Sequence, residues 1–145
     1  MSKKKQSQSN ISGNDSSNNG SGGKFHPKNK LNDLTGREWI KFTKSWILFN
    51  ALHSDLKEER EALGDISKDH PATFSPTMVS EFVQFFTKKG QTVLDPFLGI
   101  GSTLVACDRT GRKGIGIELS PKYAEMAKKR TDQKVFIGDA RDIDK

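Results

Sequence analysis

Residues 76 to 88 carry apolar side chains at the spacing of one helix face. Ser75 is a good N-cap, Pro76 suits the first helical position, and Gly90 can take the left-handed conformation that closes a helix. The pattern therefore predicts a helix over about 76–88. Its apolar stripe consists of Met78, Val79, Phe82, Val83 and Phe86.

Three short apolar runs, at about 92–96, 114–118 and 134–138, have the composition of buried strands. Two helical segments separate them: one covers Thr103–Arg109 and ends at Gly111, and the other begins at Ser120-Pro121 and runs to about Arg130. This alternation is typical of a parallel sheet with crossover helices. The expected fold class is α/β.

The segment 31–69 is predicted to be a leader helix followed by a charged linker. Within 36–50, the four aromatic residues Trp39, Phe42, Trp46 and Phe49 follow a spacing of three, four and three that suits one helix face. A packing role is the favoured interpretation, and a ligand or DNA contact is the alternative. Residues 53–69 are rich in charge and predict an exposed linker or a short solvated helix.

Residues 1–30 have the composition of a disordered tail. Sixteen of the thirty are Ser, Asn or Gly, so the segment cannot bury enough apolar surface to offset its chain entropy. Six lysines against Asp15 give the tail most of the chain's net charge of +6. A solubilising role is favoured, and a loose contact to nucleic-acid phosphates is the alternative.

Composition also limits the cellular context. A single cysteine, Cys107, excludes an internal disulfide and a cysteine-based zinc site, and it is expected to be a small core residue. No metal is expected. No signal peptide and no apolar run near the ~20 residues of a membrane span are seen. We therefore expect a soluble, cytoplasmic protein without a membrane partner.

Candidate chemistry gathers where the predicted strands end. Gly99 and Gly101 would let the backbone approach a ligand, Glu118 could accept two hydrogen bonds from a ribose diol, and Asp139 could meet an adenine amino group. A dinucleotide fingerprint needs a third glycine where this chain has Leu104. A plain tight turn would explain the two glycines alone. The whole set favours an adenosyl ligand without pyrophosphate, such as S-adenosylmethionine.

The run DPFLGIGSTLVA (95–106) followed by GIGIELSPKYAEMAKKR (114–130) resembles the amino-methylating DNA methyltransferases, which make N6-methyladenine or N4-methylcytosine. HPATFSPTMVSEFV (70–83) is similar to an upstream element of this family, and VFIGDARDI (135–143) to the segment that approaches the cofactor adenine. The resemblance implies a partial Rossmann-like, S-adenosylmethionine-dependent methyltransferase fold over 70–145, truncated after the third strand.

The resemblance also implies roles for individual positions, all of them in cofactor binding. It places a first group around the amino acid and ribose of the cofactor: Asp95, Phe97, Gly99, Gly101 and Ser102. It places Glu118 on the ribose hydroxyls, Asp139 and Ala140 at the adenine, and Thr73, Phe74 and Ser75 at the methionine end. For Phe74 and Phe97, core packing is the alternative.

The catalytic element of the family is missing from this chain. The resemblance implies a Pro-Pro-aromatic element that holds the amino group of a base flipped out of double-stranded DNA, and none of the five prolines is followed by another. The catalytic residues are therefore unknown. A fragment is the favoured interpretation. A split enzyme whose second chain supplies the catalytic half, and a non-catalytic cofactor-binding or interaction module, are the alternatives. The target base, and whether a restriction enzyme accompanies the protein, stay open.

Overall fold

The structure is a computed structural model that describes residues 26, 28–46, 53–63 and 74–144. Nearly all of the predicted tail lies outside the described residues, and so do Phe49, residues 64–69 of the predicted linker and Thr73.

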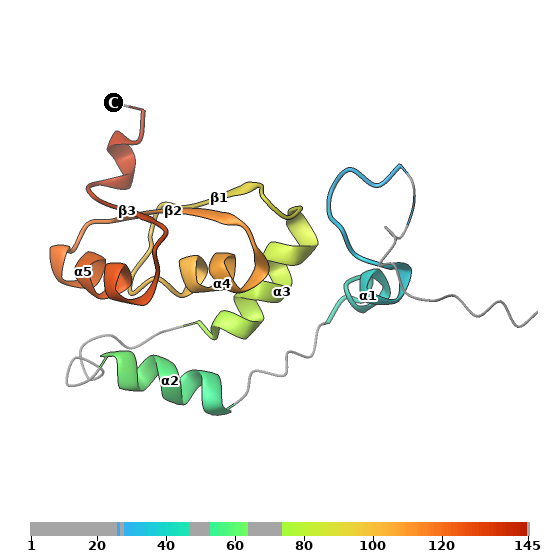
Figure 1. Ribbon diagram of the computed structural model, residues 1–145, viewed down its shortest axis with the longest axis horizontal. Helices are drawn as coiled ribbons and strands as arrows, with labels where there is room; N and C mark the ends of the chain where they lie inside the picture. The colour runs from blue at the N-terminus through green and yellow to red at the C-terminus, as the bar shows by residue number, and fades with distance from the viewer. Residues whose placement is uncertain (1–25, 27, 47–52, 64–73, 145) are drawn as a thin grey trace, which may run out of the picture.

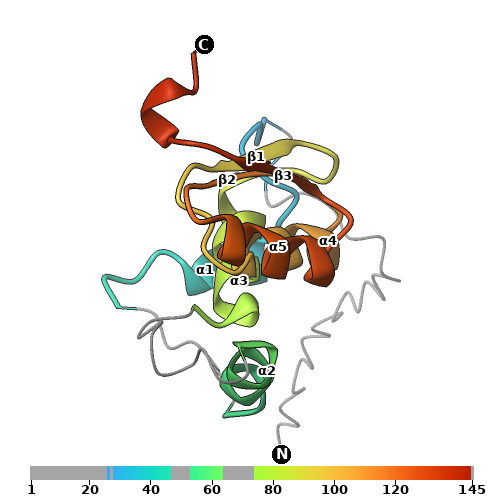
Figure 2. The same cartoon turned by 90° about the vertical axis from the view of Figure 1, so that its left-hand side faces the viewer.

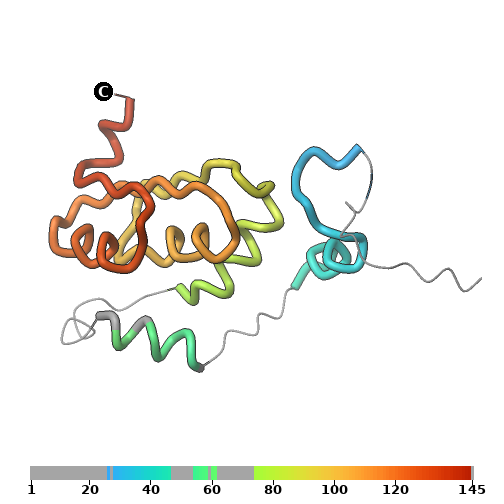
Figure 3. The backbone as a smooth tube through the Cα atoms, viewed as in Figure 1, coloured from blue at the N-terminus to red at the C-terminus, as the bar shows by residue number. Residues whose placement is uncertain are grey.

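Three parallel strands and three helices form the main body, and they alternate along the chain (Figures 1 and 3). The strands pair in the order β1-β2-β3, with Leu94 opposite Ile115 and Ile117 opposite Phe136. The predicted α/β class and parallel sheet are confirmed. The elements are α3 (Pro76–Phe86), β1 (Thr92–Asp95), α4 (Ser102–Thr110), β2 (Lys113–Glu118), α5 (Pro121–Arg130) and β3 (Lys134–Ile137), followed by a short 3-10 helix, Ala140–Asp142.

Local sequence signals explain where these elements begin and end. The Ser75 side chain accepts a hydrogen bond from the amide of Met78 at the start of α3. Gly111 closes α4 with a φ of 70°, a conformation that glycine adopts without strain. Pro121 begins α5 as predicted. Each predicted helix and strand of this body is present, with ends displaced by one or two residues.

Helices α3, α4 and α5 all lie on the same side of the sheet (Figures 1 and 2). Leu98, Leu104 and Ala127 form the buried cluster between the layers, and Val135 packs against it. Gly114 on β2 makes this approach possible, because a methyl group there would collide with the Leu104 side chain. Cys107 is fully buried in α4, as expected of a core residue.

The leader helix is shorter than the aromatic spacing predicts. Helix α1 covers only Gly36–Lys41, and it begins with a capping box in which Thr35 and Glu38 exchange hydrogen bonds. The Thr43 hydroxyl donates to the Ile40 carbonyl, a local bond that competes with continuation of the helix.

The aromatic residues of the leader therefore do not share one face. Trp39 and Phe42 pack on Phe85 of α3, with ring centroids 5.0 and 4.5 Å away. Trp46, in contrast, is exposed, and the Lys44 ammonium lies 5.2 Å from its ring centroid. The packing interpretation is confirmed for Trp39 and Phe42 and is wrong for Trp46.

Two further contacts attach the leader to the main body. The Asn32 side chain is fully buried and donates a hydrogen bond to the carbonyl of Phe85. The Lys88 ammonium donates to the carbonyl of Asn29, which falls within the predicted tail. Residues 28–30 are therefore part of the leader. Within the charged segment, the solvated helix is α2 (His53–Leu63).

Candidate functional site at the carboxyl edge of the sheet

The loop after β1 is a compact turn held by its own polar groups. The Asp95 carboxylate accepts a hydrogen bond from the amide of Phe97 at 3.0 Å, a typical aspartate-stabilised turn. The amide of Leu98 donates to the carbonyl of Ile117 on β2, and the buried Leu98 side chain anchors the loop beneath the sheet. The loop is therefore fixed before any ligand arrives.

Glu118 joins this loop to the end of β2. One carboxylate oxygen accepts from the amide of Gly99 at 2.7 Å, and the other accepts from the amide of Ser120 at 2.8 Å. A carboxylate has about four acceptor positions, so each oxygen keeps capacity for another donor. The structure thus brings together Glu118 and the glycine loop, 19 residues apart in sequence.

The two loop glycines have different reasons to be glycine. Gly99 has a φ of 57°, which favours glycine whatever surrounds it. Gly101 has a φ of 92° and is buried, and a Cβ atom there would lie 2.9 Å from the Cβ of Ala127. Packing against α5 is therefore a sufficient reason for glycine at position 101, and a role of Gly101 in ligand access stays a prediction. Ser102, also buried, begins α4.

Phe74 and Phe97 are exposed. Their relative exposures are 67% and 81%, so the core-packing alternative is wrong for both side chains. Leu119, next to Glu118, is 69% exposed. Large apolar groups on the loops that follow β1 and β2 are available to cover a bound ligand.

Asp139 follows β3 as predicted, but its carboxylate is engaged locally. The Arg141 guanidinium donates to both Asp139 oxygens at 3.0 Å, and the Arg141 amide donates at 2.9 Å. These hydrogen bonds, from the side chain first and the amide second, lower the pKa of Asp139 to about 2. The end of β3 is tied to β2 by the amide of Gly138, which donates to the carbonyl of Glu118. Ala140 begins the 3-10 helix beside it.

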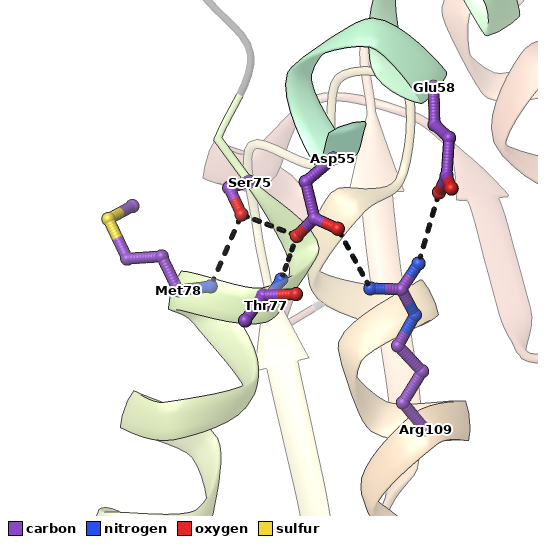
Figure 4. A network of polar contacts seen from close by, with 6 residues as sticks. All are labelled: Asp55, Glu58, Ser75, Thr77, Met78 and Arg109. Carbon is purple, nitrogen blue, oxygen red and sulfur yellow. Dashed lines mark hydrogen bonds and ion pairs between the residues drawn. The ribbon is translucent and has the colours of Figure 1, made fainter. Parts of the chain in front are cut away.

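Ser75 belongs to a separate polar network at the start of α3 (Figure 4). Its buried hydroxyl donates to the Asp55 carboxylate of α2 at 2.7 Å, and the amide of Thr77 donates to the same oxygen at 3.0 Å. The other Asp55 oxygen lies 3.9 Å from Arg109, which also pairs with Glu58. The Ser75 hydroxyl joins α3 to α2 through Asp55, and its predicted place at the methionine end of a cofactor stays a prediction.

The Asp55 carboxylate is stabilised in its charged form. Burial alone would raise the pKa of Asp55, but hydrogen bonds from Thr77 and Ser75, with the charge of Arg109, lower it below its ordinary value. Sequence reasoning missed Asp55, because its partners are 20 and more residues away and no local pattern marks it.

The described residues contain neither a metal site nor a membrane span. Within the described ranges, no group of three His, Cys, Asp or Glu side chains could hold a metal ion. No helix in that part of the chain is long and apolar enough to cross a membrane. Burial raises the pKa of the Cys107 thiol to about 11, so this cysteine is an inert packing residue.

Comparison with known proteins relates this geometry to one family. Residues 2–129 match the sequence model of N6_N4_Mtase, DNA methylase. M.BamHII, an orphan methyltransferase of Bacillus amyloliquefaciens, is 28% identical over 121 residues, which are 79% of this chain and 45% of the relative. The type II methyltransferase M.BglI of Bacillus subtilis is 41% identical over 64 residues, which are 44% of this chain and 18% of the relative.

A crystal structure from Thermus thermophilus has a similar fold. TTHA0409, assigned to the DNA modification methylases, is 30% identical, with a TM-score of 0.50 over 72% of this chain and 39% of that one. The same Thermus protein has also been crystallised in complex with S-adenosyl-L-methionine. The chain described here spans less than half the length of each of these three relatives.

The family match covers most of the chain and includes the glycine loop, Glu118 and the helix that follows it. The three parallel strands with their crossover helices are the corresponding part of the Rossmann-like methyltransferase fold. This chain belongs to the N6_N4_Mtase family of DNA methylases.

Proposed function

We propose that this chain is the S-adenosyl-L-methionine-binding part of a DNA methyltransferase that methylates an exocyclic base amino group, N6 of adenine or N4 of cytosine. One observation carries the proposal. The Glu118 carboxylate is held between the amides of Gly99 and Ser120, at the edge of the sheet where α/β proteins bind ligands.

The donors and acceptors at this edge fit the cofactor. The remaining lone pairs of Glu118 would accept the two ribose hydroxyls, and the fixed glycine loop would lie against the ribose and the amino-acid portion. Phe97, exposed on that loop, would cover the cofactor on one side. When bound, the cofactor supplies an electrophilic methyl group. The chain's own residues bind it and orient it.

The other predicted cofactor contacts have to be compatible with the hydrogen bonds that these side chains already make. Asp139 would meet the adenine amino group through lone pairs that Arg141 leaves open, with Ala140 beside it. Asp95 would act by holding the turn that presents Phe97. Phe74, exposed at the start of α3, would reach the methionine end, and Thr73 precedes it. Ser75 would be a positioning residue, because its hydroxyl is already bound to Asp55.

Methyl transfer would require more than this chain contains. The 145 residues have no Pro-Pro-aromatic element to clamp a flipped base, and they span 45% of M.BamHII and 39% of TTHA0409. Transfer needs the base nitrogen held in line with the methyl group, and positioning of this kind supplies much of the rate of an enzyme. We therefore propose a cofactor-binding fragment without activity of its own, whose complete enzyme acts on double-stranded DNA.

Calorimetric titration of the chain with S-adenosyl-L-methionine tests the proposal. Replacing Glu118 with alanine should lower the affinity about tenfold or more, because hydrogen bonds to a charged group contribute about 1.5–3 kcal/mol. Glu118→Gln, which keeps one carbonyl acceptor, should lie between wild type and Glu118→Ala. Glu125→Ala is the matched control, since Glu125 is exposed on α5 and its carboxylate pairs with Lys128.

Thermal melts without cofactor separate a binding defect from a folding defect. An unchanged affinity in a folded Glu118→Ala variant would exclude Glu118 from the site. No heat of binding and no thermal shift in the wild-type chain would exclude the proposed function.

A further inference from the structure

The loop that joins β1 to α4 is also bound on a side away from Glu118. The Arg130 guanidinium, in the last position of α5, donates a hydrogen bond to the carbonyl of Ile100 at 2.8 Å. Ile100 lies between the two loop glycines and is only 2% exposed. Two charged side chains therefore hold peptide groups of this loop: Glu118 holds the amide of Gly99, and Arg130 holds the carbonyl of Ile100.

The bond from Arg130 is possible because α5 approaches this loop closely. The loop runs from the sheet to the helix layer beside the end of α5 (Figure 3). Ala127 is fully buried, and a Cβ atom at Gly101 would lie 2.9 Å from the Cβ of Ala127, so only glycine permits this approach. Arg130 follows Ala127 by three residues and therefore lies on the same face of α5, from which its long side chain reaches Ile100.

The loop needs such bonds because its own backbone is weakly constrained. Gly99 and Gly101 both have a positive φ, and glycine changes between positive and negative φ more readily than other residues do. The peptide group between Ile100 and Gly101 is planar, so a bond to its carbonyl also fixes the direction of its N–H. This N–H donates to the carbonyl of Leu98 at 3.2 Å and closes the turn. Arg130 therefore holds the peptide group that leads from the turn into α4.

Arg130 differs in this respect from the basic residues beside it. Lys128 pairs with Glu125 on the same helix, and Lys129 is exposed. Cations in the last turn of a helix stabilise the helix dipole, and this role accounts for the two lysines. Arg130 is partly buried and makes a charge-assisted hydrogen bond to the backbone of another segment, which is stronger than a bond between neutral groups. Its contact with the loop goes beyond the helix-dipole role.

We propose that Arg130 is a positioning residue for cofactor binding. It acts through the Ile100 carbonyl and does not touch the cofactor. By fixing the loop, it keeps the amide of Gly99 on the Glu118 carboxylate, and the remaining lone pairs of Glu118 stay directed at the ribose hydroxyls. The inference rests on the proposed function, in which S-adenosyl-L-methionine lies against Glu118 and this loop. Without Arg130, the loop spends part of its time in conformations that cannot bind, and the apparent affinity falls in proportion.

The test measures cofactor affinity and amide protection in variants of the 145-residue chain. Arg130→Met keeps a long apolar side chain and removes the donors. It should lower the affinity for S-adenosyl-L-methionine in calorimetry about tenfold, the result expected when the loop is competent to bind about a tenth of the time. In the cofactor-free protein, hydrogen exchange of the Gly99 amide, followed by NMR, should become about tenfold faster or more, while the amide of Cys107 within α4 keeps its wild-type rate. Arg130→Lys, which retains a compact cationic donor, should lie between wild type and Arg130→Met.

Lys129→Met is the matched control, because it removes the same charge one residue away at an exposed position, and it should change neither measurement. Equal acceleration of exchange at Gly99 and Cys107 would show a general contribution of Arg130 to stability and overturn the proposal. An unchanged affinity in Arg130→Met, or an equal loss in Lys129→Met, would also overturn it. If Arg130→Met does not fold, Arg130→Lys decides by the same measurements.

The wild-type chain separates this proposal from the proposed function. If wild type binds S-adenosyl-L-methionine and the Arg130 variants bind it equally well, only the positioning role fails. If wild type binds none, the proposed function fails, and the positioning role fails with it.

Discussion

The two faces of the sheet are made by alternate residues of the same strands, yet they differ in how fully they are packed. On the helix side, Leu104 is fully buried, and Gly114 and Gly116 leave room for the side chains above them. On the face opposite the helices, Leu94 and Phe136 are about half exposed. The helix side holds the buried core of the described residues, and the opposite face leaves apolar side chains partly in water.

A matched pair of leucines should give the largest difference between the faces. Leu104→Ala should lower the free energy of unfolding by about 3 kcal/mol, because the residue is fully buried and leaves a cavity. Leu94→Ala should lower it by less than about 1 kcal/mol, since half of the side chain is in water. Urea unfolding measures both. Equal losses would mean that something already covers Leu94 on the face opposite the helices.

Two glycine substitutions provide a second comparison of stability, one beneath the helices and one at an open position. Gly114→Val should destabilise the chain by about 1–3 kcal/mol, because the added side chain meets Leu104 and Cys107. A Cβ at Gly138 meets nothing within 4 Å, so Gly138→Val should cost under about 1 kcal/mol. The same urea experiments apply. A Gly114 variant as stable as wild type would show that the helix layer can move away from the sheet.

The smallest expected loss of stability comes from the polar contact between α2 and α3. Asp55→Ala should cost about 1–2 kcal/mol, because it leaves the Ser75 hydroxyl and the Thr77 amide without their acceptor. Glu58→Ala, which removes only an exposed ion pair with Arg109, should cost under about 0.5 kcal/mol.

The contribution of Asp55 should also depend on pH. Its folded-state pKa is below the ordinary value, so its stabilisation is present above about pH 4 and is lost as the pH falls through the folded pKa. Wild type and Asp55→Ala should therefore converge in acid. A constant difference between their stabilities across that range would exclude the charged form of Asp55 as the cause.

Much of the main body could be predicted from sequence because its signals are local. Ser75, Pro121 and Gly111 mark helix ends by their own chemistry, and the strands between them are short apolar runs. The order of these elements was enough to predict the parallel sheet.

Features that depend on distant partners could not be predicted. The ending of α1 depends on a hydroxyl bond at Thr43, and Asp55 has its role only because α3 brings Ser75 to it. Gly101 lies in a loop whose spacing indicates ligand access, and only the position of Ala127 shows that packing requires the glycine. At the candidate site, sequence reasoning proposed Glu118 and the glycine loop as neighbours, and their hydrogen bond appears in the structure.

The most direct test uses S-adenosyl-L-methionine with a tritiated methyl group, the purified 145-residue chain and mixed double-stranded DNA. Equilibrium dialysis counts label held by the protein, and precipitation of the DNA counts label transferred. The account predicts label bound by the wild-type chain, about tenfold or more weakly by Glu118→Ala, and no label in the DNA. Dose-dependent labelling of DNA by the chain alone, or no label retained by the protein, would contradict it.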